Sequence, residues 1–241
     1  MPELPEVETI RKGLQEYLVG HTIRDIEVRM PKIVEGETND IIGGKVIGVR
    51  RFGKGLVIDL DNEYLLAIHI KLTGQLIYQN NKLRIKNKGR IKIIKGTYSA
   101  LPHKSTHVIF TLDKHAVLYY NDFRRFGWIR IVKSSKLKEQ SFFKDLGHEF
   151  PMGEVSQVSK VPQVPKGERQ DALSLEDFIE ILKKTKGSIK PLLLDQKKMA
   201  GLGNIYANDG LWLAGIDPRK SAKTLNDKEI KKLYKIGRAH V

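Results

Sequence analysis

Eight short strand-like runs within the first 132 residues constrain the fold more than any other feature. Each run alternates apolar and polar residues, and turn pairs such as Gly43-Gly44 and Asp61-Asn62 separate them. Many short strands at this spacing predict an antiparallel β-sandwich or barrel. The predicted strands are Thr22–Arg29, Lys45–Arg51, Leu56–Leu60, Tyr64–Ile70, Gln75–Tyr78, His107–Leu112, Ala116–Tyr120 and Trp128–Val132.

Helical patterns lie on both sides of this region. Residues 6–19 place apolar side chains such as Val7, Leu14 and Leu18 on one face, and Gly20 ends the pattern. Later in the chain, Ser174 and Asp177 resemble a capping box with Asp in place of Glu. The sequence therefore predicts an α+β protein. The later predicted helices are Ser174–Lys186, Ile189–Asp195, Ile205–Leu213 and Asn226–Tyr234.

Three prolines with Ser, Gln and Gly mark residues 151–172 as a linker. We expect a β-sandwich domain over residues 1–150 and a helical domain over residues 173–236. The last six residues break the helical pattern at Gly237 and resemble a translated sequencing adapter. We expect residues 236–241 to be a non-native tail and the natural protein to continue beyond about Lys235.

Composition narrows the class of partner. The chain has 43 Lys and Arg against 28 Asp and Glu, a net charge of +15. This charge favours a polyanionic partner, with nucleic acid the first candidate and an anionic membrane the second. There is no cysteine, so thiolate metal sites are excluded, and the seven histidines show no paired metal spacing. No 18-residue apolar run or signal peptide is visible, so the expected location is the cytoplasm or nucleoid.

A basic run spans residues 82–96, with Lys or Arg at 82, 84, 86, 88, 90, 92 and 95 and no acid between them. A period of two places these cations on one face of a strand or hairpin. Two interpretations stay open. The run is either a ribbon that follows phosphates or a solvated edge hairpin kept soluble by its lysines.

The first nine residues suggest chemistry. Removal of Met1 would leave Pro2 as a secondary amine, and an N-terminal amine is roughly 14% free base at pH 7. A free, nucleophilic amine is what imine chemistry requires, and Glu3, Glu6 and Glu8 are nearby candidate proton donors. Taken as composition alone, the same residues also suit an ordinary helix start.

Two turns carry further candidates. Lys54 lies between Gly53 and Gly55, where glycine permits close approach of another backbone, although this motif taken alone favours an ordinary turn lysine. The segment His69–Gly74 ends a buried strand with a polar turn. Leu72 in this turn is either an apolar wedge that props open a base stack or a leucine that packs back into the core.

A third turn, Tyr120–Gly127, joins two strands and contains Arg124, Arg125 and Phe126. Paired arginines beside an aromatic residue suit nucleic acid, with charge for phosphates and a ring for stacking. The alternative is an arginine paired with Asp122.

The segment Ala200–Tyr206 precedes a predicted helix. Asn204 is the candidate N-cap, and two glycines expose backbone N–H groups where a phosphate would bind. With the preceding short helix, this turn forms a helix–two-turns–helix arrangement, and Lys190 is a further nearby cation. A plain capped helix start is the alternative.

Three of these motifs together resemble the bacterial formamidopyrimidine-DNA glycosylases. They are Pro-Glu-Leu-Pro-Glu-Val-Glu-Thr at the N-terminus, Asn-Asp-Phe-Arg-Arg-Phe-Gly and Gly-Leu-Gly-Asn-Ile-Tyr-Ala. The resemblance runs from Pro2 to about Tyr234 in the family's order. The related endonuclease VIII group keeps a Pro-Glu start but typically lacks Leu-Pro-Glu-Val-Glu after it.

The resemblance implies a DNA repair enzyme that excises oxidised purines, such as 8-oxoguanine and formamidopyrimidines, from duplex DNA. It implies that Pro2 attacks C1′ and forms a Schiff base, that Glu3 transfers a proton at the sugar, and that β,δ-elimination cuts the strand. Lys54 matches a lysine that contacts phosphate and donates a proton. The implied DNA-binding residues are His69, Leu72, Arg124, Phe126, Lys190, Asn204 and Tyr206.

Two departures stand out. The family usually has Met where this chain has Leu72, which preserves an apolar wedge. The family also ends in a four-cysteine zinc finger, whereas this chain has no cysteine. Since Zn²⁺ belongs to the finger, we expect no cofactor in this chain. We also expect the chain to be a monomer and to bind DNA more weakly than a family member with the finger. The alternatives are an oxidised-pyrimidine enzyme of the endonuclease VIII type and a nucleic-acid-binding protein without catalysis.

Overall fold

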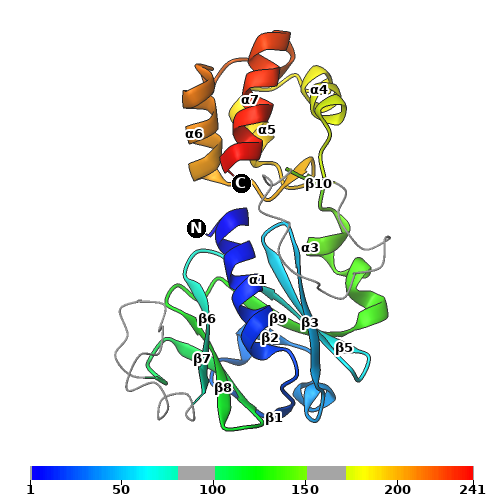
Figure 1. Ribbon diagram of the computed structural model, residues 1–241, viewed down its shortest axis with the longest axis vertical. Helices are drawn as coiled ribbons and strands as arrows, with labels where there is room; N and C mark the ends of the chain where they lie inside the picture. The colour runs from blue at the N-terminus through cyan, green and yellow to red at the C-terminus, as the bar shows by residue number, and fades with distance from the viewer. Residues whose placement is uncertain (1, 81–100, 151–171, 241) are drawn as a thin grey trace. The chain divides into compact units, whose positions relative to one another are not determined.

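The structure is a computed structural model that describes residues 2–80, 101–150 and 172–240, and the side chains of these residues up to Gly237. The chain divides into two compact units (Figure 1). Unit 1 contains Pro2, Glu6–Arg51 and Gly55–Lys138. Unit 2 contains the chain from Glu139 onward together with two short pieces of the first half, Glu3–Pro5 and Phe52–Lys54.

Unit 1 contains two sheets. The five-stranded sheet has the order β2-β9-β5-β4-β3, and the four-stranded sheet has the order β1-β7-β8-β6. Neighbouring strands are antiparallel in the pairs β4–β5, β5–β9, β1–β7, β7–β8 and β6–β8, and parallel in β2–β9. The strands are β1 (Ile23–Val28), β2 (Val34–Glu35), β3 (Val46–Phe52), β4 (Gly55–Leu60), β5 (Tyr64–His69), β6 (Gly74–Asn80), β7 (Thr106–Leu112), β8 (Ala116–Asp122) and β9 (Trp128–Lys133).

The core of unit 1 draws side chains from both sheets and from helix α1 (Leu4–Leu18). Leu56 and Ile58 of the larger sheet join Phe110 and Leu118 of the smaller sheet in one buried cluster, with Leu14 of the helix. Full burial of such a side chain contributes about 1.5–3 kcal/mol to the free energy of unfolding. The alternation in the sequence thus becomes a sandwich with one shared interior.

The predicted α+β fold is confirmed. All eight predicted strands are present, with ends that differ by one or two residues, and the N-terminal helix begins two residues earlier than predicted. The strands β2, β10 (His148–Glu149) and β11 (Met199–Ala200) were not predicted, because two-residue strands leave no alternation to detect.

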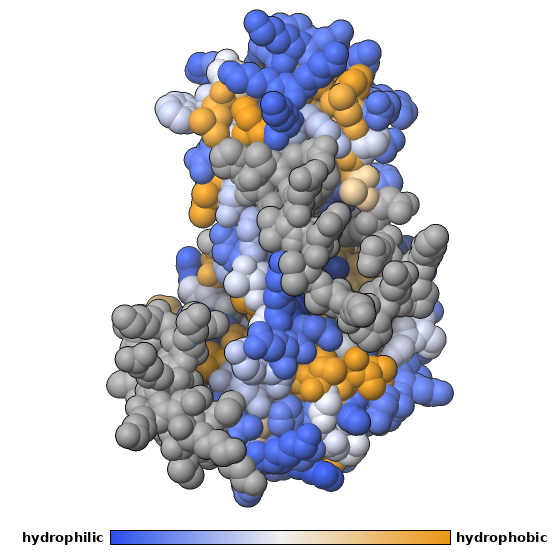
Figure 2. All heavy atoms as spheres, viewed as in Figure 1, coloured by the Kyte–Doolittle hydropathy of each residue, from blue (hydrophilic) through white to orange (hydrophobic). Residues whose placement is uncertain are grey.

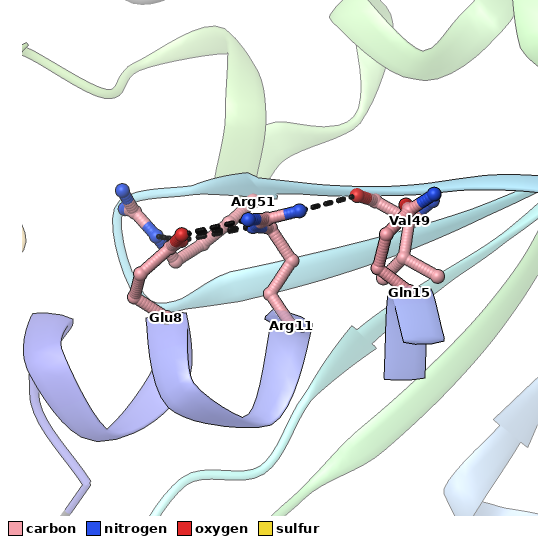
Figure 3. Close-up of polar contacts among 5 residues, drawn as sticks. All are labelled: Glu8, Arg11, Gln15, Val49 and Arg51. Carbon is pink, nitrogen blue, oxygen red and sulfur yellow. Dashed lines mark hydrogen bonds and ion pairs between the residues drawn. The ribbon is translucent and has the colours of Figure 1, made fainter. Parts of the chain in front are cut away.

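Helix α1 is fastened to β3 by a half-buried ion cluster (Figure 3). The Glu8 carboxylate accepts hydrogen bonds from Nε of Arg11 at 3.0 Å and from Nε of Arg51 at 2.9 Å. Gln15 of the same helix accepts from the backbone N–H of Val49 at 2.9 Å. Burial raises the pKa of Glu8, but the two arginines outweigh it and hold that pKa below the usual 4.5. A carboxylate kept charged in this way does not suit the proton donor that the sequence suggested.

Unit 2 is mainly helical. Its core contains the aromatic side chains Phe150, Phe178 and Tyr234, whose ring centroids lie 5.6–5.7 Å apart. The helices are α3 (Ser141–Lys144), α4 (Leu175–Lys184), α5 (Ile189–Leu194), α6 (Asn204–Ala214) and α7 (Asp227–His240). Strands β10 and β11 pair in parallel. Among the described residues of both units, short 3₁₀ helices span Pro31–Ile33, Thr38–Ile41, Ser134–Glu139 and Ala222–Thr224.

Local signals explain where two of these helices begin and end. Ser174 is the N-cap of α4, since its Oγ accepts from the Asp177 N–H at 3.0 Å, as the capping pattern predicted. Helix α6 ends at Gly215, whose φ of 73° is the left-handed conformation that glycine adopts easily.

The predicted break at Gly237 is wrong, because α7 continues to His240. A single glycine inside a helix costs only about 1 kcal/mol, so it does not end one by itself. A Cβ at this position would overlap the Phe150 ring, which shows how closely the helix packs here. The predicted basic run at residues 82–96 and almost all of the predicted linker lie outside the described residues.

The surface is mixed in character. On the face seen in Figure 2, hydrophilic residues cover most of the described surface, and hydrophobic residues form separate patches. None of the helices in the described ranges combines the length and apolar character needed to cross a lipid bilayer.

We predict that Glu8→Gln lowers the free energy of unfolding by about 2 kcal/mol at pH 7, because it removes a charge that two arginines stabilise. The pKa of Glu8 is lower in the folded chain, so its contribution is present above pH 4.5 and is lost as the pH falls through the folded value. The gap between variant and wild type should therefore close in acid. Thermal unfolding at several pH values measures this, with the exposed Glu16→Gln on the same helix as control. A gap that stays constant below pH 4 would contradict it.

Candidate active site and nucleic-acid interface

The tip of the β3–β4 hairpin belongs to unit 2. Gly53 has a φ of 54°, in the left-handed region, and its N–H donates to Oε1 of Glu149 at 2.5 Å. A Cβ on Gly53 would lie 3.4 Å from Cβ of Ala200. The glycine therefore supplies both the turn and the close approach that the sequence predicted for this position.

Lys54 follows this turn and is only 5% exposed. Its Nζ donates to the carbonyl oxygen of Leu202 at 2.6 Å. This hydrogen bond orients the ammonium group. The contact fixes Lys54 on the segment Ala200–Tyr206, which the sequence pattern predicted separately as a phosphate-binding turn.

Gln196 organises the same segment and was missed by sequence reasoning. Its amide nitrogen donates to the Leu202 carbonyl oxygen at 2.8 Å, and its Oε1 accepts from the Gly201 N–H at 3.0 Å. The Leu202 carbonyl thus accepts from both Gln196 and Lys54. Gln196 ends no helix and belongs to no charge pattern, so the sequence offered no signal for this role.

Glu3 binds the beginning of helix α6. Glu3 is only 1% exposed. Its carboxylate accepts hydrogen bonds from the N–H of Ile205 at 2.8 Å and from the N–H of Tyr206 at 3.3 Å. The first N–H groups of a helix lack partners within the helix, and the helix dipole favours a negative charge there. The Leu4 N–H also donates to the Gly201 carbonyl, at 3.3 Å.

Asn204 is not the N-cap that the sequence predicted. Gly203 occupies the cap position in extended conformation, and Asn204 is the first residue of α6. Gly203 has no side chain to cap the helix, and the Glu3 carboxylate instead binds the N–H groups of Ile205 and Tyr206, the two that a capping side chain at position 203 would bind. The amides expected to bind a phosphate are therefore engaged by a carboxylate of the chain itself. Asn204 is exposed.

The remaining candidates of this part of the chain are Pro2, Tyr206 and Lys190. Pro2 is half-buried and directly precedes Glu3 in the chain. Tyr206 is half-buried near the start of α6. Lys190 lies in the first turn of α5 and is half-buried, and its N–H donates to the Pro218 carbonyl at 3.3 Å.

Besides Pro2, unit 1 holds four candidates, which are His69, Leu72, Arg124 and Phe126. Leu72 is half-buried in the turn between β5 and β6. This turn is bonded to the loop that carries Arg124 and Phe126, because Oγ1 of Thr73 accepts a hydrogen bond from the Arg124 N–H at 2.9 Å. The Phe126 side chain is 55% exposed, and Cζ of Arg124 lies 5.3 Å from the centre of its ring. The structure thus brings these three residues together within unit 1.

His69 has a more structural setting. It is 5% exposed, its Nδ1 accepts from the Lys71 N–H at 3.0 Å, and its ring lies 5.8 Å from that of Trp128. The Nδ1 atom is therefore an acceptor, which leaves the proton of the neutral ring on Nε2.

Comparison with known proteins identifies the family. The family model for the formamidopyrimidine-DNA glycosylase N-terminal domain matches residues 1–129, and that for the formamidopyrimidine-DNA glycosylase H2TH domain matches residues 165–238. The chain belongs to the formamidopyrimidine-DNA glycosylase family. This agrees with the resemblance carried by the three sequence motifs.

Curated members of the family are similar over nearly the whole chain. The formamidopyrimidine-DNA glycosylase of Pelotomaculum thermopropionicum is 36% identical over 98% of this chain and 74% of its own length. That of Streptococcus agalactiae is 35% identical, with the same coverage.

Solved structures of family members are also similar. A complex of wild-type Lactococcus lactis Fpg (MutM) with N7-benzyl-Fapy-dG-containing DNA has a TM-score of 0.77 at 28% identity, over 98% of this chain and 76% of that chain. A structure of MutM with carbocyclic 8-oxo-G-containing DNA has the same TM-score and identity.

The residues present do not fit the zinc finger of the family. The chain has no cysteine, so it lacks the ligands of a four-cysteine site. In the part of the chain that the structure describes, no cluster of three or more His, Asp or Glu side chains is arranged to hold a metal ion.

We predict that Gly203→Ala lowers the free energy of unfolding by about 1–3 kcal/mol, because the added Cβ would overlap the Glu3 carboxyl group. The φ of −129° at Gly203 suits alanine, so the effect comes from displacing Glu3 and not from backbone strain. Thermal unfolding measures the change. Gly187→Ala is the matched control, since no atom lies within 4 Å of its added Cβ. Equal stability of the two variants would contradict the prediction, because it would show that the Glu3 side chain can move aside without a measurable cost.

Proposed function

We propose that this chain is a bifunctional DNA glycosylase and abasic-site lyase that excises oxidised purines, such as 8-oxoguanine and formamidopyrimidines, from duplex DNA. The proposed nucleophile is the nitrogen of Pro2, freed by removal of Met1. Family membership supports the general class of reaction, and the geometry of the described residues supports the assignment of roles.

One observation carries the proposal. Glu3 and Lys54 lie in separate sequence motifs. Both form hydrogen bonds with the same segment, Leu202–Tyr206, within unit 2. Both polar groups are held by backbone atoms and are nearly inaccessible to solvent. Such fixed groups need little rearrangement before they act on a substrate. Pro2 is one peptide bond from Glu3, so the attachment of Glu3 restrains the nucleophile as well.

The reaction follows from the chemistry of a secondary amine. The Pro2 nitrogen attacks C1′ of the damaged nucleotide, and the base leaves with the electrons of the glycosidic bond. Opening of the sugar ring gives an iminium ion between Pro2 and C1′. Its positive charge makes the C2′ proton acidic, so β-elimination expels the 3′ phosphate. A second, δ-elimination then expels the 5′ phosphate.

Glu3 and Lys54 supply the remaining charges in this scheme. Glu3 transfers a proton at the sugar as the ring opens. Lys54 is oriented by the Leu202 carbonyl, and its ammonium group attracts a phosphate and donates a proton to the departing base.

The proposed DNA contacts divide by chemistry. His69, Lys190, Asn204 and Tyr206 provide hydrogen-bond donors for phosphates. Leu72, Arg124 and Phe126 fill the space that a base leaves when it turns out of the duplex. Their setting supports this, since the exposed Arg124 and Phe126 lie on a loop that is bonded to the turn of Leu72.

We predict that borohydride traps a covalent protein–DNA adduct on duplex DNA that contains 8-oxoguanine, because hydride reduces the Pro2 imine to a stable amine. Pro2→Gly, and protein that retains Met1, should lose the adduct. Denaturing gel electrophoresis measures trapping, with mass spectrometry to verify the N-terminus. Pro31→Gly, an exposed proline in unit 1, is the control that should trap like wild type.

Other outcomes identify the alternatives. Trapping by protein that retains Met1 would point to a lysine nucleophile. Faster cleavage of thymine glycol than of 8-oxoguanine would indicate an enzyme of the endonuclease VIII type. Intact Met1 with DNA binding and no adduct would indicate a nucleic-acid-binding protein without catalysis.

A further inference from the structure

Two neighbouring loops of unit 1 leave the sheets at matching positions. The turn Lys71–Thr73 connects β5 to β6, and the loop Phe123–Gly127 connects β8 to β9. Gly74 is opposite Asp122 in the β6–β8 pair, and His69 is opposite Trp128 in the β5–β9 pair. Both loops therefore cross side by side from one sheet of the sandwich to the other.

Asp122 lies at the base of these loops and is 0% exposed. Its Oδ2 accepts from the Gly127 N–H at 2.8 Å, and its Oδ1 accepts from the Arg124 N–H at 3.2 Å and from the hydroxyl of Thr73. Each of these donors is neutral. Among the described residues, Asp122 forms no ion pair with an arginine, which answers the alternative that the sequence left open.

Thr73 provides the link between the loops. Its hydroxyl donates to Asp122 and accepts from the Arg124 N–H at 2.9 Å. One oxygen thus joins the turn that carries Leu72 to both the buried carboxylate and the backbone of the second loop. Gly127 closes the arrangement, since a Cβ there would overlap the Tyr120 hydroxyl.

We propose that Asp122 and Thr73 are positioning residues that form a clamp, through which Leu72, Arg124 and Phe126 enter the duplex as one rigid group. This inference rests on the proposed function and adds a second requirement to it. Without the clamp, the two loops would have to be ordered separately when a base is extruded, and this ordering has an entropic cost.

The partners of Asp122 explain how the clamp leaves Arg124 available. A buried carboxylate usually attracts a nearby guanidinium group, but here backbone and hydroxyl donors satisfy it. The Arg124 side chain stays in the exposed part of the loop beside the Phe126 ring. The clamp thus orders the backbone of Arg124 without consuming its charge.

Thr73→Val tests the clamp, because valine keeps the β-branched shape and removes only the hydroxyl. We expect the amide hydrogens of residues 122–127 to exchange about tenfold faster in the variant, measured by hydrogen exchange and mass spectrometry. Thr111→Val, an exposed threonine on β7, is the matched control and should match wild type. Unchanged exchange in Thr73→Val would overturn the clamp, whether or not the protein acts on DNA.

A second measurement tests its role in base extrusion. We expect Thr73→Val to cleave 8-oxoguanine duplex about tenfold more slowly in single turnover, while cleavage of a duplex with a preformed abasic site changes less than about twofold. Only the first substrate contains a damaged base to extrude. Equal losses on both substrates, or no loss on either, would overturn the positioning role. Wild-type protein that cleaves neither would overturn the proposed function, and hydrogen exchange would still decide whether the clamp exists.

Discussion

The attachment of the Glu3 carboxylate to the amides of Ile205 and Tyr206 is the interaction on which the candidate active site depends. A carboxylate that is 1% exposed needs donors nearby, and the free N–H groups at the start of a helix provide them. The two partners are about 200 residues apart in the sequence. This bond therefore fixes the first residues of the chain on a helix formed near its end.

The two most specific sequence motifs fit each other, which explains why the second needs its glycines. A Cβ on Gly201 would overlap the Leu4 side chain, and a Cβ on Gly203 would overlap the Glu3 carboxyl group. The N-terminal motif supplies the side chains, and the Gly-Leu-Gly motif supplies the space they occupy. A larger residue in the second motif would displace a specific residue of the first, so the two motifs form one structural feature.

Much of the fold could be predicted from the sequence because it depends on local patterns. Short apolar runs bounded by turn residues located all eight longer strands, and Ser174 marked the start of α4. A prediction was wrong where a distant group replaced a local signal, since Glu3 caps a helix that Asn204 was expected to cap. Gln196 and the Asp122–Thr73 clamp depend on contacts between separate segments, and no sequence period encodes such contacts.

The candidate sites share a way of holding charged groups. Glu3 and Asp122 accept from backbone amides and a hydroxyl, and Lys54 donates to a backbone carbonyl. By contrast, Glu8 of α1 is bonded to two arginines, and it serves to fasten the helix. The partners named for Glu3, Lys54 and Asp122 carry no formal charge, so these hydrogen bonds orient the side chains without forming an ion pair. The type of partner thus separates the ion cluster that fastens α1 from the hydrogen bonds that fix these three side chains in place.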